Sequence, residues 1–408
     1  MNPNIRAALL FLILFFAGTG CDKDPVTEDP VFDYNLKSAR VIETNNNFGL
    51  ELMQRVLESE EAANIMISPA SVSIALGMTY NGAEQATREA FEQLLDYEGL
   101  TREEVNEITM ELIHVLVTNA DGNQLEIANS IWSDEGFPVK KAFIDLNTYY
   151  FDAEVREIDL QTAEALEAIN NWVSEKTHGK IDKILQKINP ETVMILLNAL
   201  YFNCLWETEF DPEDTYEAPF HDEAGHISTS AEMMNLESTF NVALTDEFSA
   251  IELPYKHDKF SMFLFLPAAG STVSDLVNSL DGDTWNSWLD RFAEIEEFSV
   301  TIPKFKFGFQ RSLSDDLKQM GLEIAFTGAA DFSGISDIPV FISEVIHKTY
   351  IDVNEEGTEA AAVTAVVIDY SSIGNDLIVF DRPFLFAITE NSSNSILFIG
   401  TVSEPEYE

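Results

Sequence analysis

Six histidines and two cysteines are the residues through which this chain could bind a metal or hold a catalytic base or thiol. His221 and His226 are separated by four residues that include Asp222 and Glu223. This is not the i, i+4 spacing of a helical metal pair, so the group favours a solvated turn. The sequence contains no Gly-x-Ser-x-Gly turn for a hydrolase nucleophile and no glycine-rich phosphate loop. It therefore predicts no catalytic site, no metal and no cofactor.

The other candidate groups also favour structural roles. His114 lies in a stretch with helical apolar spacing, which predicts a position at the edge of a core. His347 precedes Lys348 in an apolar stretch typical of a buried strand, where a hydrogen-bonded core histidine is the default expectation. Cys204 has no basic neighbour or helix start to lower its pKa, so we expect a small buried thiol.

One segment near the C-terminus combines two opposite tendencies. Residues 359–362 are good helix formers, whereas residues 363–368 are mostly β-branched and favour an extended chain. Read as a strand, one face is uncharged and mostly small, and could enter between neighbouring strands. A buried strand in an ordinary sheet would show the same pattern. That face consists of Thr358, Ala360, Ala362, Thr364, Val366 and Ile368.

Residues 355–362, followed by Thr364, resemble the hinge of the reactive-centre loop of an inhibitory serpin, a family in which loop insertion is an established transition. Further motifs extend the resemblance over nearly all of the chain beyond its N-terminus. Asn203 and Cys204 depart from it, since they replace the usual Lys-Gly pair. The matching segments are 64–71, 82–84, 169–173, 177–181, 198–202, 253–255, 302–305, 330–335, 347–348, 381–386 and 398–400.

The resemblance implies an α+β architecture, the serpin fold, in which helices pack around three β-sheets and the reactive-centre loop is exposed. Helical spacing dominates the first half of the chain, beginning with an amphipathic stretch from about residue 35 to 60, and strand-like segments dominate the second half. No long linker interrupts the sequence after residue 35. We therefore expect a single domain over residues 35–408.

Two groups of functional residues are implied by the resemblance. A gate under the central sheet would consist of Ser68, Ser71, Asn198 and His347. Ser68-Pro69 also reads as a strand-to-helix junction, so helix capping alone is an alternative for the serines. Glycine at 357 would let the backbone turn. The hinge would consist of Glu355, Gly357, Thr358, Glu359, Ala360, Ala361 and Ala362.

The implied activity is suicide-substrate inhibition of a serine protease, with a non-inhibitory serpin acting as an envelope binding module as the alternative. Counting from Gly357 places the scissile bond at Ser371-Ser372, and counting back from Pro383 places it one residue later. Tyr370-Ser371 is a third candidate and would suit a chymotrypsin-like enzyme, whereas serine would suit an elastase-like enzyme. No Arg or Lys occurs between Thr358 and Asp381, which argues against trypsin-like targets.

The net charge of the chain argues against several classes of binding partner. The chain has 408 residues and a formal net charge of −48, so its surface repels nucleic acid and anionic lipid. Only Arg88 and Arg102 are basic between Glu84 and His114, so a heparin-like cofactor is not expected. We expect a monomer. The acidity is also consistent with a high-salt habitat, where counterions screen the repulsion.

The N-terminus reads as an export signal with a lipid anchor. Residues 1–20 contain one positive charge, Arg6, an apolar run and small residues, as in a signal peptide. Cys21 follows them directly and resembles the acceptor of a bacterial lipobox, although Gly18 replaces the usual large aliphatic residue. Residues 21–34 are acidic, contain two prolines and read as a flexible tether. The expected location is the bacterial cell envelope or cell surface.

Overall fold

The computed structural model describes residues 35–120, 122–358 and 377–407. The expected leader, the tether and Cys21 lie outside these ranges. No helix within them is long and apolar enough to cross a membrane. The helices are α1 (Leu36–Ser59), α2 (Pro69–Tyr80), α3 (Gln85–Leu94), α4 (Arg102–Leu116), α5 (Lys141–Phe151), α6 (Ala163–Lys176), α7 (Val273–Asn278), α8 (Gly282–Leu289) and α9 (Ser314–Leu317).

Sixteen strands lie between and after the helices of the described ranges. They are β1 (Asn64–Ile67), β2 (Thr118–Ala120), β3 (Asn123–Asp134), β4 (Glu154–Ile158), β5 (Met194–Leu205), β6 (Tyr216–His221), β7 (Ile227–Leu244), β8 (Phe248–Pro254), β9 (Phe260–Pro267), β10 (Ala293–Pro303), β11 (Phe305–Ser312), β12 (Ile346–Val353), β13 (Gly357–Thr358), β14 (Leu377–Val379), β15 (Phe384–Glu390) and β16 (Ser395–Val402). The predicted α+β class is confirmed.

Local sequence signals explain where the first helices begin. The side chain of Asn35 accepts hydrogen bonds from the backbone N–H groups of Lys37 and Ser38 and so caps α1. The predicted helix from about residue 35 to 60 is therefore confirmed. At the next junction, Pro69 occupies the first turn of α2 and Ser68 Oγ accepts from the N–H of Ser71 at 3.2 Å.

The strands form two hydrogen-bonded networks within the described residues. One contains nine strands, in the order β1-β16-β15-β9-β8-β7-β10-β14, with β6 paired to β7. Its strands β7 and β10 pair from Met233 with Pro303 to Val242 with Ala293, with a bulge between Ile295 and Phe298. The other contains seven strands, in the order β11-β12-β13-β5-β3-β2, with β4 paired to β3.

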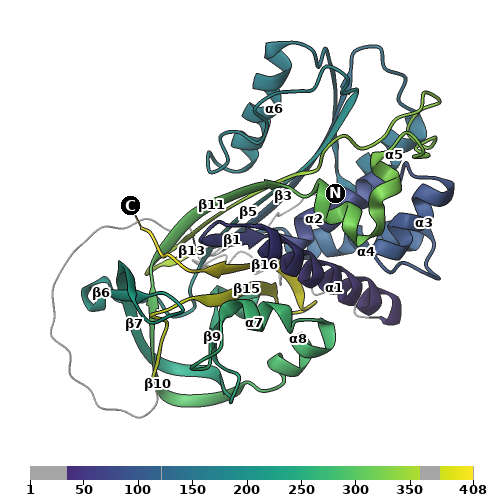
Figure 1. The fold of residues 1–408 in the computed structure, drawn as a ribbon. Coiled ribbons are helices and arrows are strands. Elements are labelled where there is room, and N and C mark those ends of the chain that lie inside the picture. The colour runs from purple at the N-terminus through teal and green to yellow at the C-terminus, as the bar shows by residue number, and fades with distance from the viewer. Residues whose placement is uncertain (1–34, 121, 359–376, 408) are drawn as a thin grey trace, which may run out of the picture.

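The seven-stranded sheet is covered on both faces. On one face α6 lies apart from the other helices (Figure 1), above a small cluster that includes Trp132, Ile169 and Trp172. On the other face α2 and the main hydrophobic core pack against the sheet. The central strands therefore have packed side chains on both faces, although more than half of the β5 residues are only partly buried.

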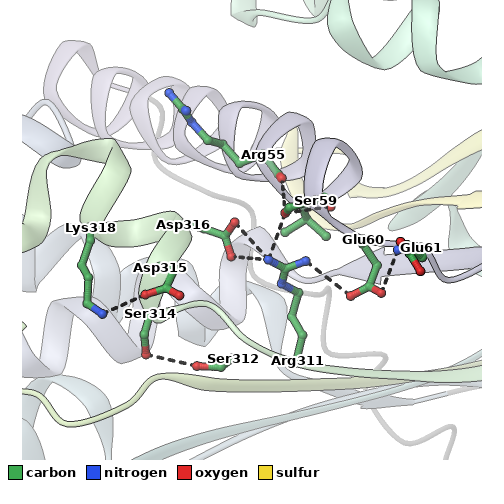
Figure 2. Close-up of polar contacts among 11 residues, drawn as sticks. Arg55, Ser59, Glu60, Glu61, Arg311, Ser312, Ser314, Asp315, Asp316 and Lys318 are labelled. Atoms are coloured by element: carbon green, nitrogen blue, oxygen red, sulfur yellow. Dashed lines mark hydrogen bonds and ion pairs between the residues drawn. The ribbon is translucent and has the colours of Figure 1, made fainter.

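At one end of this sheet, Arg311 fastens β11 to the helices. Figure 2 shows its guanidinium between the end of α1 and the start of α9. It donates to Asp316 Oδ2 at 2.9 Å and Oδ1 at 3.1 Å, to Ser59 Oγ at 3.1 Å and to Glu60 Oε2 at 3.4 Å. Burial raises the pKa of Asp316, although the Arg311 charge opposes that shift. One guanidinium nitrogen, Nη2, thus contacts both carboxylate oxygens of Asp316, and this charge-assisted contact ties β11 to α9.

Candidate functional site

The candidate site is a gap in the seven-stranded sheet between β5 and β12. Strand β3 pairs with one edge of β5 from Met194 to Cys204, and β11 pairs with one edge of β12 over the whole strand. The facing edges of β5 and β12 are joined in the described sheet only through the two residues of β13. Within the residues that the structure describes, two long strand edges therefore face each other with only β13 between them.

A cavity of about 560 Å³ lies along this gap. Its walls include residues of β5, the start of β12, α2 and the loop before β12. All four predicted gate residues, Ser68, Ser71, Asn198 and His347, line it. The cavity is therefore positioned where an additional strand would continue from β13.

The gate residues link the two edges through the start of α2. The N–H of Ser68 donates to Nε2 of His347 on β12 at 3.0 Å. Ser71 Oγ donates to Oδ1 of Asn198 on β5, and Ser68 and Ser71 are themselves connected by the capping bond. The two strands are thus bridged by small neutral groups that can exchange partners without exposing a charge.

Asn129 lies on β3, the strand paired with β5, and is hydrogen-bonded to the gate residue Asn198. Its Oδ1 accepts from Asn198 Nδ2 at 2.8 Å, and its own Nδ2 donates to the carbonyl of Phe151 at 2.8 Å. Sequence reasoning missed Asn129, because a single asparagine in an apolar strand carries no local signal for its partner. Its only sequence-level hint is that a buried amide must find hydrogen bonds.

His347 is neutral in this arrangement. Nε2 accepts the Ser68 N–H, so the proton of the neutral ring lies on Nδ1. Burial lowers the pKa of His347 to about 4. Protonation of His347 would place an Nε2–H donor opposite the Ser68 N–H donor and break the hydrogen bond between them.

The hinge residues Gly357 and Thr358 form β13, which pairs with Val353 of β12 and with Cys204 and Leu205 of β5. A Cβ on Gly357 would lie 2.2 Å from the Cys204 carbonyl oxygen. This glycine therefore allows close packing against β5, and its carbonyl accepts from the N–H of Asn354 at 3.0 Å across the turn between β12 and β13. Thr358 is buried, and its Oγ1 lies 2.6 Å from the hydroxyl of Tyr255.

Glu355 anchors the start of the hinge by charge. Its Oε2 lies 3.2 Å from Nζ of Lys304, and both side chains are 9 % exposed. Its Oε1 accepts from Thr215 Oγ1 at 2.8 Å. Lys304 also pairs with Glu232 Oε2 at 3.3 Å, but the Glu232 side chain is 51 % exposed. The Lys304–Glu355 pair is consequently the buried ion pair of the hinge.

Two aromatic residues, Trp206 and Tyr255, contact the hinge residues through hydrogen bonds. Trp206 and Tyr255 stack with ring centroids 4.5 Å apart. Trp206 Nε1 donates to the carbonyl of Asn354 and its backbone N–H donates to the carbonyl of Glu356, both at 2.9 Å. Burial raises the pKa of Tyr255, so its hydroxyl stays protonated and able to bond Thr358. Roles for Trp206, Tyr255 and Lys304 in the hinge were not predicted; a lysine within an apolar run was the one available hint.

The remaining predicted loop residues cannot be placed. Glu359, Ala360, Ala361 and Ala362 of the hinge lie outside the described residues, and so do the candidate bond residues Tyr370, Ser371 and Ser372. The described chain resumes at Leu377, where β14 pairs in parallel with β10. The site is therefore defined by the gap and by the hinge residues that enter it.

His114, His226 and Cys204, the other candidate chemical groups, each have a defined place in the fold. His226 Nδ1 lies 3.3 Å from Asp222 Oδ2 in the turn between β6 and β7, as expected for a solvated turn. His114 lies on α4 but is exposed, so its predicted place at a core edge is wrong. Cys204 is fully buried, and burial raises the pKa of its thiol. Within the described ranges, no group of three His, Cys, Asp or Glu side chains could hold a metal.

Comparisons with known proteins agree with this geometry. A family profile described as Serpin (serine protease inhibitor) matches residues 43–405. The chain is 36% identical to a serpin-like protein of Methanosarcina acetivorans over 98% of this chain and 96% of that protein. It is 33% identical to intracellular coagulation inhibitor 2 of Tachypleus tridentatus over 91% of each chain. The native structure of tengpin, a thermophilic serpin, matches with TM-score 0.81 and 34% identity, covering 92% of this chain and 96% of tengpin.

Proposed function

The chain belongs to the serpin family of serine protease inhibitors, and on that premise we propose that it is a suicide-substrate inhibitor that traps its protease as an acyl-enzyme. The observation that carries the proposal is β13. Residues Gly357 and Thr358 already occupy the first positions of a strand between β5 and β12, and the cavity continues beyond them. A cleaved loop would extend the sheet from this starting point.

The chemistry begins as ordinary acyl transfer. The protease serine oxygen attacks a carbonyl of the bait, the peptide bond breaks, and the new amino terminus leaves with a proton. The acyl part of the loop remains joined to the protease by an ester bond. Insertion of the severed loop then competes with the water molecule that would hydrolyse the ester.

Insertion would carry the attached protease along the molecule. Residues 358–371 would span about 46 Å as a strand at about 3.3 Å per residue. A protease whose oxyanion hole is lost by distortion would deacylate more slowly by about 10²–10³-fold. Hydrogen bonds along the two free edges and the filling of the cavity would supply the driving force.

The bait sequence favours chymotrypsin-like or elastase-like targets. The proposed bond is Ser371-Ser372, with Tyr370-Ser371 and Ser372-Ile373 as alternatives, and no basic residue lies between Thr358 and Asp381. A serine fits a small specificity pocket, and a tyrosine fits a large apolar one. Trypsin-like enzymes, which need Lys or Arg at this position, are disfavoured.

Incubation with chymotrypsin and with elastase, followed by denaturing electrophoresis, tests the proposal. We expect a complex that survives detergent, because protease and inhibitor are joined by the ester. Intact mass of the released C-terminal peptide identifies the bond that was cut. Simple clipping without a complex by every protease tested would contradict the inhibitor and support the non-inhibitory envelope binding module.

We also propose that Cys21 carries lipid and holds a monomeric protein at the bacterial cell envelope or surface. The support is the small-residue cleavage site before Cys21 and the acidic tether that follows it. Expression of the full chain in a bacterial host, with fractionation and mass analysis of the N-terminal peptide, tests this proposal. Cys21→Ser should release the protein from the membrane fraction, and unchanged membrane retention would contradict lipidation at this residue.

A further inference from the structure

The last described residues of the chain lie against the hinge. The N–H of Lys306 donates to the carbonyl of Glu406 at 2.9 Å, which fastens the C-terminal tail to β11. Pro405 is buried and Tyr407 is half-buried. The ring centroid of Tyr407 lies 4.2 Å from Nζ of Lys304 and 5.9 Å from Nζ of Lys306. The tail thus places an aromatic face on the lysine that pairs with Glu355.

This contact has the geometry of a strong cation–π interaction. A separation of 4.2 Å is well inside the roughly 6 Å range, and the Lys304 side chain is only 9 % exposed. Burial, reinforced by the Asp352 charge, raises the pKa of Tyr407 to about 12. The phenol is therefore neutral at physiological pH and covers the lysine without adding a competing anion.

The position of Tyr407 affects the strength of the ion pair. A charge pair shielded from water is attracted more strongly and is less sensitive to salt than an exposed pair. Any movement of the hinge that displaces Glu355 must break its contact with Lys304. A group that shields this contact therefore raises the free energy needed to open the hinge.

We propose that Tyr407 is a positioning residue that shields the Lys304–Glu355 pair and keeps the hinge closed until the bait is cut. This timing role rests on the proposed inhibitory function, because premature opening would let the uncut loop enter the gap. Tyr407 acts through Lys304 and touches no part of the substrate. We call residues 405–407 the clasp, because they contact the hinge through Lys304.

Hydrogen exchange at the hinge amides of the intact protein measures the clasp directly. The N–H of Trp206 donates to the carbonyl of Glu356, and the N–H of Phe210 donates to that of Glu355. We expect Tyr407→Ala to accelerate exchange at both amides about tenfold. Tyr407→Phe retains the ring over Lys304 and loses only the hydroxyl contacts with Asn354 and Asp352, so it should restore rates to within about threefold of the parent. Tyr149→Ala on α5, an exposed tyrosine remote from the hinge, should change neither rate.

A double-mutant cycle separates action through the ion pair from general packing of the tail. If Tyr407 acts through the pair, Tyr407→Ala should add little to the exchange rates in a Glu355→Gln background. Exchange in Tyr407→Ala should also accelerate between about 50 mM and about 500 mM salt, whereas the parent should respond weakly. Should the Glu355→Gln protein not fold, the alanine and phenylalanine variants decide the question alone.

Unchanged exchange in Tyr407→Ala, equal acceleration in Tyr407→Phe, or full acceleration in the Glu355→Gln background would each overturn the clasp. Exchange requires no protease, so this outcome is independent of inhibition. A chain that shows the exchange effects but traps no protease would contradict the proposed function alone. A chain that traps protease with unchanged exchange would contradict the clasp alone.

Discussion

The two edges of strand β12 differ in how many of their residues pair with a neighbouring strand. One edge is paired with β11 along the whole strand, from Ile346 with Ser312 to Val353 with Phe305. The other edge is paired in the described sheet only at Val353, with Thr358. Among the described residues, the remainder of this edge borders the cavity and has room for a further strand. Hydrogen bonds to an entering strand along this edge are the free energy that the proposed insertion would use.

The groups that border the open edge also differ from one end to the other. At the hinge, a buried ion pair between Lys304 and Glu355 fixes the residues that precede β13. At the gate, neutral side chains bridge β5 and β12 through α2. The charged end must separate an ion pair in order to move, whereas the neutral end can exchange hydrogen-bond partners without separating charges. Substitutions at the two ends should therefore have distinct effects.

The largest effect is expected from a charge placed on the entering face. Thr358→Arg should reduce the ratio of trapped to released protease at least about a hundredfold, because Thr358 is 3% exposed and an unpaired buried charge is strongly unfavourable. Thr358→Ser keeps the hydroxyl that bonds Tyr255 and serves as the control. Quantitative electrophoresis of complex and clipped inhibitor measures the ratio. A complex yield equal to that of the parent would show that entry of this face is not required.

Breaking the hinge ion pair should have the next largest effect. Glu355→Gln leaves Lys304 buried beside Glu232 and should lower the free energy of unfolding by about 3 kcal/mol. Glu232→Gln removes the other, half-exposed partner of the same lysine and should cost less than about 1 kcal/mol. The urea midpoint of the first unfolding transition compares the two. Equal losses would show that burial does not distinguish the two carboxylates.

Acid should weaken the gate through His347. The folded pKa is about 4, below the ordinary value of about 6.5, so the unfolded chain binds more protons between these values. Stability from this group is complete above about pH 6.5, is lost as pH falls toward 4, and changes by up to about 3 kcal/mol. His347→Gln, whose amide oxygen can still accept from Ser68, should remove this part of the pH dependence. Parallel stability curves for the two proteins would contradict the role of His347.

The smallest effect concerns a single hydroxyl on α2. Ser71→Ala removes the bond to Asn198 and should destabilise the protein by about 1 kcal/mol. Ser73 is also buried on α2, but its Oγ has no hydrogen-bond partner in the described part of the chain. Ser73→Ala should therefore be neutral or slightly stabilising. Thermal unfolding of both variants tests this difference, and equal destabilisation would argue against a specific bridge at Ser71.

The sequence predicted those features that local chemistry determines. The Ser68-Pro69 junction, the cap before α2 and the burial of Cys204 follow from residue type and immediate neighbours, and the structure agrees. Such features require only a few consecutive residues, so a single sequence contains the needed information.

Features assembled from distant segments were not predictable. Lys304 and Glu355 are 51 positions apart in the chain, and Tyr407 lies 52 beyond Glu355. No local pattern indicates that these residues meet, because the sheet register and the path of the tail determine their contact. The same holds for Asn129 at the gate and for Arg311 at the paired edge of β11. Their roles depend on three-dimensional packing that sequence periodicity does not specify.

Hydrogen exchange along β5 and β12, before and after the bait is cut, tests the central claim most directly. The relevant amides are those that face the gap and are not bonded to β3 or β11. The account predicts that they exchange readily in the uncut protein and become strongly protected after cleavage, as a new strand pairs with both edges. Unchanged exchange at these amides after complete cleavage would contradict insertion and, with it, the trapping mechanism.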